Sequence, residues 1–207
     1  MKVGVIIEGS TKHRTVDVLK SLEGTGHDII CLGMQNVPDE PDLSYMETGL
    51  MTALVLNLKS VDFVVGGCGT GQGYMNAVLQ FPGTACGLIY DPVEAWLYSQ
   101  VNAGNVISLP LNKGYGGIGG DINVRFILER LWQDEYGAGY PAARREIQIG
   151  ARKRLQKLSV DAHKSMQEIW DILDPELIGR VLEFPGFLNH IKAAPDGDLK
   201  NHILSKL

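Results

Sequence analysis

Residues 61–73, VDFVVGGCGTGQG, join a short apolar run to a cluster of glycines. The run at residues 61–66 predicts a buried strand, since short apolar runs bounded by turn residues are typical of strands covered on both faces. The amphipathic stretch at residues 73–81 predicts a helix after the glycines. Strand, glycine turn and helix in this order indicate one βα unit of a parallel sheet.

The same alternation recurs along the first two thirds of the chain. Further strands are predicted at residues 2–7, 28–33, 84–90 and 105–111, and connecting helices within residues 11–25, 44–60, 92–101 and 121–136. Crossovers of this length suit right-handed parallel connections. The pattern therefore predicts an α/β, Rossmann-like fold of three layers, α/β/α, around a five-stranded parallel sheet.

The pattern changes to helix upon helix after Pro141. Helices are predicted at residues 142–158, 159–173, 175–182 and about 198–204, with a break at residues 184–187. We place a Rossmann-like domain at residues 1–140 and a C-terminal helical extension at residues 141–207. The extension packs either on the sheet domain or on a second subunit, and both remain open at this point.

Composition and charge exclude several classes of function. The chain has 207 residues, is 44% hydrophobic and carries a formal net charge of -5 without a run of Lys or Arg, which argues against nucleic acid as a partner. The N-terminus becomes polar too early for a signal peptide, and no apolar stretch approaches transmembrane length. We therefore expect a cytoplasmic protein without a membrane partner. Its cysteines and histidines have no metal-ligand spacing, so neither a metal nor another cofactor is expected.

The glycine-rich turn at residues 66–73 is the main candidate site, because doubly wound sheets bind ligands beyond the carboxyl ends of their strands. Its N–H groups can approach an anion, and the following helix adds the positive end of its dipole. Cys68 lies at the same strand end, where the dipole favours a thiolate that can take a proton. The alternative is that Cys68 fills space in the core, as we expect for Cys31 and Cys86. No Walker lysine and no GxGxxG motif accompany the turn, which disfavours a nucleotide-dependent oxidoreductase.

Several short motifs follow one another along residues 2–136: CGTGQG at 68–73, FPG at 81–83, YDP at 90–92 and NAGNV at 102–106. Their order and spacing resemble the type B ribose-5-phosphate and galactose-6-phosphate isomerase family. In that family the cysteine is the base that moves a proton between sugar C1 and C2, so the resemblance implies this role for Cys68. It also implies a homodimer or homotetramer whose active sites draw residues from two chains.

The resemblance assigns further roles around the cysteine. Asn102 matches the family asparagine that hydrogen-bonds the intermediate, and the alternative for it is a helix C-cap amide. Backbone N–H groups of the turn become the donors to the developing enediolate oxygen. The turn residues concerned are Gly69, Thr70, Gly71 and Gly73.

The chain departs from the family pattern at several places. Glu8-Gly9 stands where the family has Asp-His after the first strand. Val101 stands where the family has the histidine that opens the sugar ring. Gln148 stands at the second position of the family's phosphate-binding arginine pair, of which only Arg144 remains. The candidates to compensate are Arg145 and Arg152.

Other polar residues near the strand ends are candidate substrate ligands. The basic trio at residues 12–14 is placed to replace the missing phosphate ligands, and the alternative is a solvated helix face. The glycine-rich residues 114–121 form either a mobile lid or a simple connection, of which the connection is favoured. The full set assigned to substrate binding is Glu8, Ser10, Lys12, His13, Arg14, Asp42, Tyr45 and Arg144.

The leading hypothesis is a metal-free sugar-phosphate aldose–ketose isomerase that works through a cis-enediolate. Because Val101 cannot open a sugar ring, a short or otherwise acyclic sugar phosphate is the expected substrate. The competing explanation is that His13 opens the ring of an ordinary pentose or hexose phosphate. The alternative from another class is a non-catalytic sugar-phosphate binding or regulatory protein on the same fold.

Overall fold

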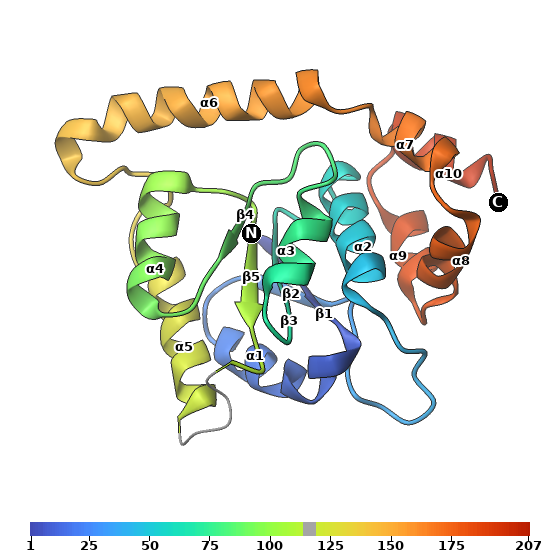
Figure 1. The fold of residues 1–207 in the computed structure, drawn as a ribbon, viewed down its shortest axis with the longest axis horizontal. Coiled ribbons are helices and arrows are strands. Elements are labelled where there is room, and N and C mark those ends of the chain that lie inside the picture. Colours follow the sequence, from blue (N-terminus) through green and yellow to red (C-terminus); the bar gives the residue numbers. More distant parts are fainter. Residues whose placement is uncertain (114–118) are drawn as a thin grey trace.

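The computed structural model describes residues 1–113 and 119–207 and is built around a five-stranded parallel sheet (Figure 1). The strands are β1 (Lys2–Ile7), β2 (Asp28–Cys31), β3 (Phe63–Cys68), β4 (Cys86–Leu88) and β5 (Val106–Pro110). Their order is β2-β1-β3-β5-β4, so the sheet grows in opposite directions from β1 and β3. The predicted fold class is confirmed.

Helices cover both faces of the sheet. They are η1 (Gly9–Arg14), α1 (Thr15–Leu22), α2 (Tyr45–Asn57), α3 (Gln72–Val78), α4 (Pro92–Leu97), η2 (Tyr98–Asn102) and α5 (Gly120–Leu131). Successive strand residues point to opposite faces. Val64 of β3 accordingly faces the core shared with α2 and α3, whereas Val65 faces the core shared with α1, α4 and α5. These two cores make the three predicted layers.

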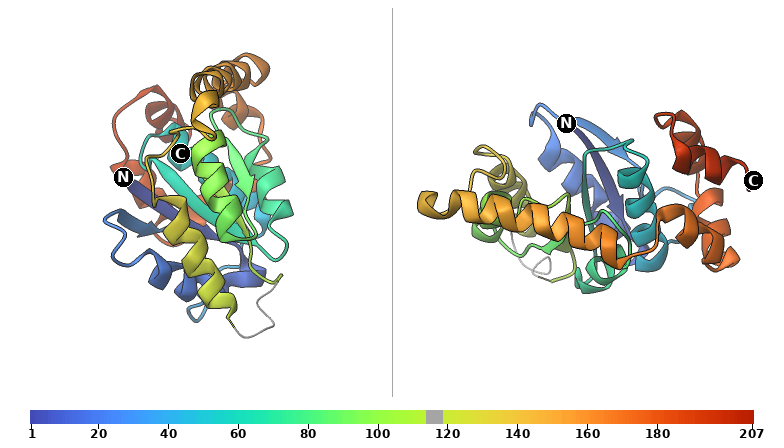
Figure 2. Two further views of the ribbon diagram at one scale, coloured as in Figure 1. Left: turned by 90° about the vertical axis from the view of Figure 1, so that its left-hand side faces the viewer. Right: turned by 90° about the horizontal axis from the view of Figure 1, so that it is seen from above.

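The C-terminal helices are η3 (Ala142–Arg144), α6 (Arg145–Ala162), α7 (Met166–Ile172), α8 (Pro175–Glu183), α9 (Phe187–Ala193) and α10 (Asp198–Leu204). Apolar side chains of α7 to α10, among them Trp170, Val181 and Phe187, belong to the same buried cluster as α2. In contrast, α6 runs along one edge of the molecule (Figure 2), and none of its 18 residues is buried. Neither α6 nor any other helix in the described residues has the length and apolar character to cross a membrane.

Several element bounds differ from the prediction. β3 continues through Gly66 to Cys68, because its pairing with β5 extends to Cys68, which lies opposite Pro110. The predicted break near residue 158 is wrong, since α6 continues to residue 162 and α7 begins at a capping box formed by Ser165 and Glu168. The helix α9 was not predicted, and the predicted helix at residues 92–101 divides into α4 and the π-helical η2. Of the predicted loop at residues 114–121, residues 114–118 lie outside the described residues.

Gly71, directly before α3, is a position where only glycine fits. Its φ is 72°, in the left-handed region, and a side chain there would collide with Leu88 of β4. We expect Gly71→Ala to lower the free energy of unfolding by about 2–4 kcal/mol, from backbone strain and overpacking together. Urea denaturation measures this change. In the control Gly179→Ala, alanine enters open space in α8 and should be neutral or stabilise by up to about 1 kcal/mol. Equal midpoints for Gly71→Ala and the unaltered protein would contradict the expectation.

Candidate active site

The carboxyl ends of β1 and β3 meet where the strand order reverses. In doubly wound sheets this switch point opens a crevice for ligands. Ile7 pairs with Gly67 across the two strands, so the next residues, Glu8 and Cys68, lie side by side. Neighbouring strands are about 4.8 Å apart, which brings a carboxylate and a thiol to one small region.

Cys68 is the last residue of β3 and is 5% exposed. Its side chain belongs to the apolar cluster beneath α2 and α3. Its carbonyl accepts the N–H of Leu111 at 3.0 Å and that of Gly71 at 3.3 Å, which fixes the turn that follows. The thiol therefore borders both the apolar core and the glycine turn.

The glycine turn offers fewer free donors than predicted. The N–H of Gly71 is engaged with the Cys68 carbonyl, and the N–H of Gln72 donates to Thr70 Oγ1 at 3.3 Å. The N–H groups of Gly69, Thr70 and Gly73 have no acceptor among the described residues. These remaining groups are the candidate donors to an oxyanion, while the left-handed Gly71 makes the turn possible.

Ser10 and Asn112 flank the first residue of the turn. A Cβ on Gly69 would lie 3.4 Å from Ser10 Oγ and 3.2 Å from Asn112 Nδ2. Ser10 also donates its hydroxyl and its N–H to the carboxylate of Glu8, which is 7% exposed. Asn112 was not among the predicted site residues. The sequence signal for it was its place directly after the predicted strand at residues 105–111, two residues beyond the observed end of β5 at Pro110.

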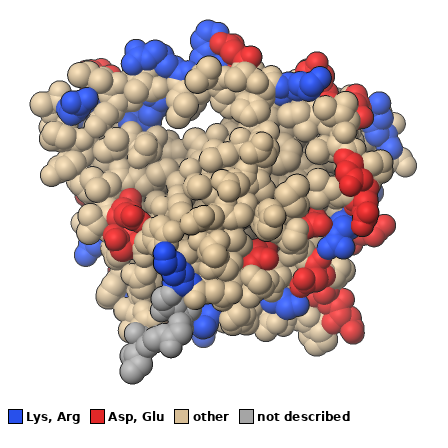
Figure 3. Space-filling view, in the orientation of Figure 1, with Lys and Arg blue, Asp and Glu red and all other residues tan. Residues whose placement is uncertain are grey.

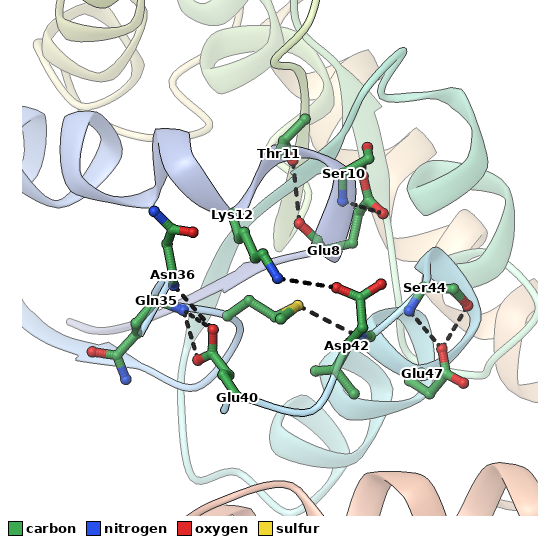
Figure 4. Close-up of polar contacts among 12 residues, drawn as sticks. Glu8, Ser10, Thr11, Lys12, Gln35, Asn36, Glu40, Asp42, Ser44 and Glu47 are labelled. Atoms are coloured by element: carbon green, nitrogen blue, oxygen red, sulfur yellow. Dashed lines mark hydrogen bonds and ion pairs between the residues drawn. The ribbon is translucent and has the colours of Figure 1, made fainter. Parts of the chain in front are cut away.

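The segment that leads into α2 lies beside η1, and Figure 4 shows Asp42 of this segment facing Lys12. Lys12 Nζ lies 3.3 Å from Asp42 Oδ1, and this oxygen lies 2.5 Å from the place of a Cβ on Gly9. Asp42 therefore fills the space that a side chain at residue 9 would need, which explains the glycine where the family pattern has histidine. The ring of Tyr45 lies 3.0 Å from the Cβ position of Gly73.

The basic trio is only partly available to an anion. Lys12 faces Asp42, and Arg14 faces Asp17 of α1 at 3.9 Å. His13 is exposed on the same 3-10 helix. Because two of the three cations face carboxylates, the trio is a weaker phosphate site than the sequence suggested.

Asn102 and Arg144 are not brought to Cys68 within one chain. Asn102 ends η2, before the amino end of β5, whereas Cys68 pairs with Pro110 at the carboxyl end. The length of β5, at about 3.3 Å per residue, separates the two places. Backbone hydrogen bonds of 2.8 and 3.0 Å join residues 137–139 to η2, so that the chain leading to Arg144 lies on the Asn102 side.

Most polar side chains around Asn102 have partners within the chain. Gln148 donates to the carbonyl of residue 140 at 2.7 Å and accepts its N–H at 2.9 Å. Arg152 donates to the Val101 carbonyl at 2.9 Å, and Arg145 forms an ion pair with Glu135 at 3.2 Å. Arg144 is exposed and has no side-chain partner among the described residues, and the same holds for the Asn102 amide, so no capping bond accounts for Asn102.

The other two cysteines belong to other strands, Cys31 to β2 and Cys86 to β4. Burial raises the pKa of Cys31 to about 11 and raises that of Cys86 further. Both fit the predicted role of apolar filler. Within residues 1–113 and 119–207, no cluster of three or more His, Cys, Asp or Glu side chains is placed to hold a metal ion.

A doubly wound sheet with a thiol, a carboxylate and free N–H groups at its switch point defines an α/β protein with a candidate site for a small polar metabolite. The chain belongs to the Ribose/Galactose Isomerase family, whose sequence model matches residues 8–133. The resemblance noted in the sequence is thereby confirmed, and the chain is a sugar isomerase of this family. No curated protein sequence matches it significantly.

Two similar solved structures extend over the whole chain. One is a 4-deoxy-L-threo-5-hexosulose-uronate ketol-isomerase in complex with a tartrate, 33% identical, with a TM-score of 0.93. The other is a ribose-5-phosphate isomerase from Vibrio parahaemolyticus, 33% identical, with a TM-score of 0.92. In both pairs the match covers 100% of this chain and 98% of the other, so the C-terminal helices are shared. A third structure, the type B ribose 5-phosphate isomerase of Trypanosoma brucei, shares the fold, with 18% identity and a TM-score of 0.62. That match covers 75% of this chain and 97% of the other.

Proposed function

We propose that the protein interconverts an aldose and a ketose through a cis-enediolate, with Cys68 as the base. The thiolate takes the proton from C2 of the aldose and returns it to C1, while a proton passes from O2 to O1, so that the carbonyl moves from C1 to C2. Glu8 and Ser10 bind the hydroxyls, and the N–H groups of the turn stabilise the charge on oxygen. The observation that carries the proposal is the placement of Cys68 beside Glu8 and next to the free N–H groups.

The substrate is better described as a sugar acid than as a sugar phosphate. Arg144, which has no side-chain partner in residues 1–113 and 119–207, is what remains of the family's phosphate pair, since Gln148 occupies the second place and is bonded to the backbone. One planar guanidinium matches a carboxylate through two parallel hydrogen bonds. Lys12, the nearest alternative, faces Asp42, so a phosphate dianion would meet a partly neutralised site.

The absence of a ring-opening group at Val101 also favours a sugar acid of this kind. A 4-deoxy-5-hexosulose uronate, named for one similar isomerase, has no hydroxyl at C4 and a carbonyl at C5. Neither position can close a ring onto the C1 aldehyde, so this aldehyde stays free and needs no acid to release it. This keeps the acyclic substrate expected from the sequence and replaces its phosphate by a carboxylate.

We further propose a dimer in which each active site receives Asn102 and Arg144 from the partner chain. Both residues lie far from Cys68 of their own chain and have no side-chain partner among the described residues. The α6 helix carries exposed apolar side chains, Ile147, Leu155 and Leu158 at 58% and Val160 at 68%, and an opening separates it from the body (Figure 3). Apolar surface of this kind is typical of interfaces.

A substrate panel tests the function. We expect kcat/KM for a 4-deoxy-5-hexosulose uronate to exceed that for ribulose 5-phosphate, tagatose 6-phosphate and erythrulose 4-phosphate by about 10–100-fold, the range for losing a charge-assisted contact. A preference for erythrulose 4-phosphate would contradict the sugar acid and support the short sugar phosphate expected from the sequence. A preference for a larger phosphate that disappears in His13→Ala would assign ring opening to His13. Turnover of none of them would favour a binding protein.

A further inference from the structure

Arg180 connects the C-terminal helices to the candidate site. It lies on α8, more than a hundred residues from the site in sequence, and its guanidinium makes two hydrogen bonds. Nε donates to Glu47 Oε1 at 2.6 Å, and Nη2 donates to the carbonyl of Asp42 at 2.6 Å. One side chain therefore holds both ends of the segment that leads from the site into α2.

Glu47 is a charged and nearly buried partner. Its side chain is 8% exposed, and its Oε2 accepts the N–H of Ser44 at 2.8 Å and the Ser44 hydroxyl at 2.5 Å. Burial would raise the pKa of Glu47, but the hydrogen bonds from Ser44 and Arg180 outweigh burial and lower it. The carboxylate thus joins the first turn of α2 to Arg180, while Ser44 caps the helix.

The segment held by Arg180 carries two candidate site residues. Asp42 lies over Gly9 and Tyr45 lies over Gly73. On the inner side the segment is attached by the N–H of Gly9, which donates to the Leu43 carbonyl at 2.7 Å, and by the Lys12 ion pair. On the outer side, the attachment comes from Arg180 through the Asp42 carbonyl.

We propose that Arg180 is a positioning residue that fixes Asp42 and Tyr45 over the mouth of the active site, so that the C-terminal helices complete the site. This inference rests on the proposed function. Displacing a site residue by about 1 Å can cost as much as 10²-fold in rate, and charge-assisted hydrogen bonds are among the stronger ways to prevent it. Because Asp42 and Tyr45 lie over Gly9 and Gly73 at the rim of the site, the effect falls on substrate binding more than on the chemical step.

The test compares Arg180→Gln with Arg180→Lys and with a control, Lys206→Gln. The control removes a surface ion pair of Lys206 with Asp171, 3.1 Å long, in the same helical region. In Arg180→Gln we expect backbone amides of residues 35–46 to exchange hydrogen faster, and kcat/KM to fall about tenfold, mainly through KM. Arg180→Lys, which can keep one bond, should recover part of the loss, and Lys206→Gln should match the unaltered protein.

A double variant shows whether Arg180 acts through Glu47. If it does, Glu47→Gln combined with Arg180→Gln costs no more than the larger of the two single changes. Unchanged exchange at residues 35–46 in a folded Arg180→Gln overturns the inference, whatever the activity. Faster hydrogen exchange in Arg180→Gln, if the unaltered protein isomerises no sugar, supports the positioning role of Arg180 and contradicts the proposed function. If Arg180→Gln does not fold, as judged by circular dichroism, Arg180→Lys decides by the same two measurements.

Discussion

Replacing Cys68 with alanine is expected to lower kcat by about 10²–10⁴-fold, the contribution of a positioned general base, while the fold and sugar binding persist. The reason is that Cys68 is the one cysteine among the described residues that lies at the carboxyl ends of β1 and β3, beside Glu8. Steady-state kinetics and a thermal melt measure the two quantities. Cys31→Ala and Cys86→Ala are the matched controls and should keep full turnover, because both thiols lie within other strands.

Alkylation gives an independent measure of the same role. At pH 8 a thiol with a pKa of about 11 is thiolate in only about one molecule in a thousand, so Cys31 should react slowly with iodoacetamide. Cys86, with its pKa raised further, should react more slowly still. We expect Cys68 to be labelled first and to be protected by bound substrate. Full activity of Cys68→Ala, or equal labelling of all three cysteines, would remove Cys68 as the base.

Complementation between two inactive variants is the second large effect that we expect. In the proposed dimer, a site uses Cys68 of one chain and Asn102 of the other. Removing an oxyanion donor typically costs about 10²–10³-fold, so Asn102→Ala alone should be nearly inactive. Co-expression of Cys68→Ala with Asn102→Ala should restore about a quarter of full activity, because half of randomly assembled dimers contain one intact site of two.

The control for this experiment puts both changes in one chain. Co-expression of Cys68→Ala with a chain carrying both Cys68→Ala and Asn102→Ala leaves no intact site and should recover nothing. If the first mixture recovers no activity, Asn102 does not serve the partner's site. Full activity of Asn102→Ala by itself would remove Asn102 from the mechanism.

Local pattern was enough to predict the sheet. Each predicted strand overlaps an observed one, because a strand buried on both faces is a short apolar run whose character does not depend on distant residues. The ends of helices were less predictable where no residue in the sequence marks a helix start or stop. The exposed α6 continues past Ser159 because nothing in its neighbourhood breaks a helix, and the capping box of Ser165 and Glu168 provides the start of α7.

The sequence by itself determined the family, the parallel sheet and the strand end that carries Cys68, since motifs and strand ends are local features. Only the tertiary structure decided that Asp42 fills the space over Gly9 and that Arg180 reaches the same segment from α8. It also decided that Asn102 and Arg144 lie away from Cys68 of their own chain. These relations join residues far apart in the sequence, and packing of the sheet against its helices sets their distances, which no local pattern encodes.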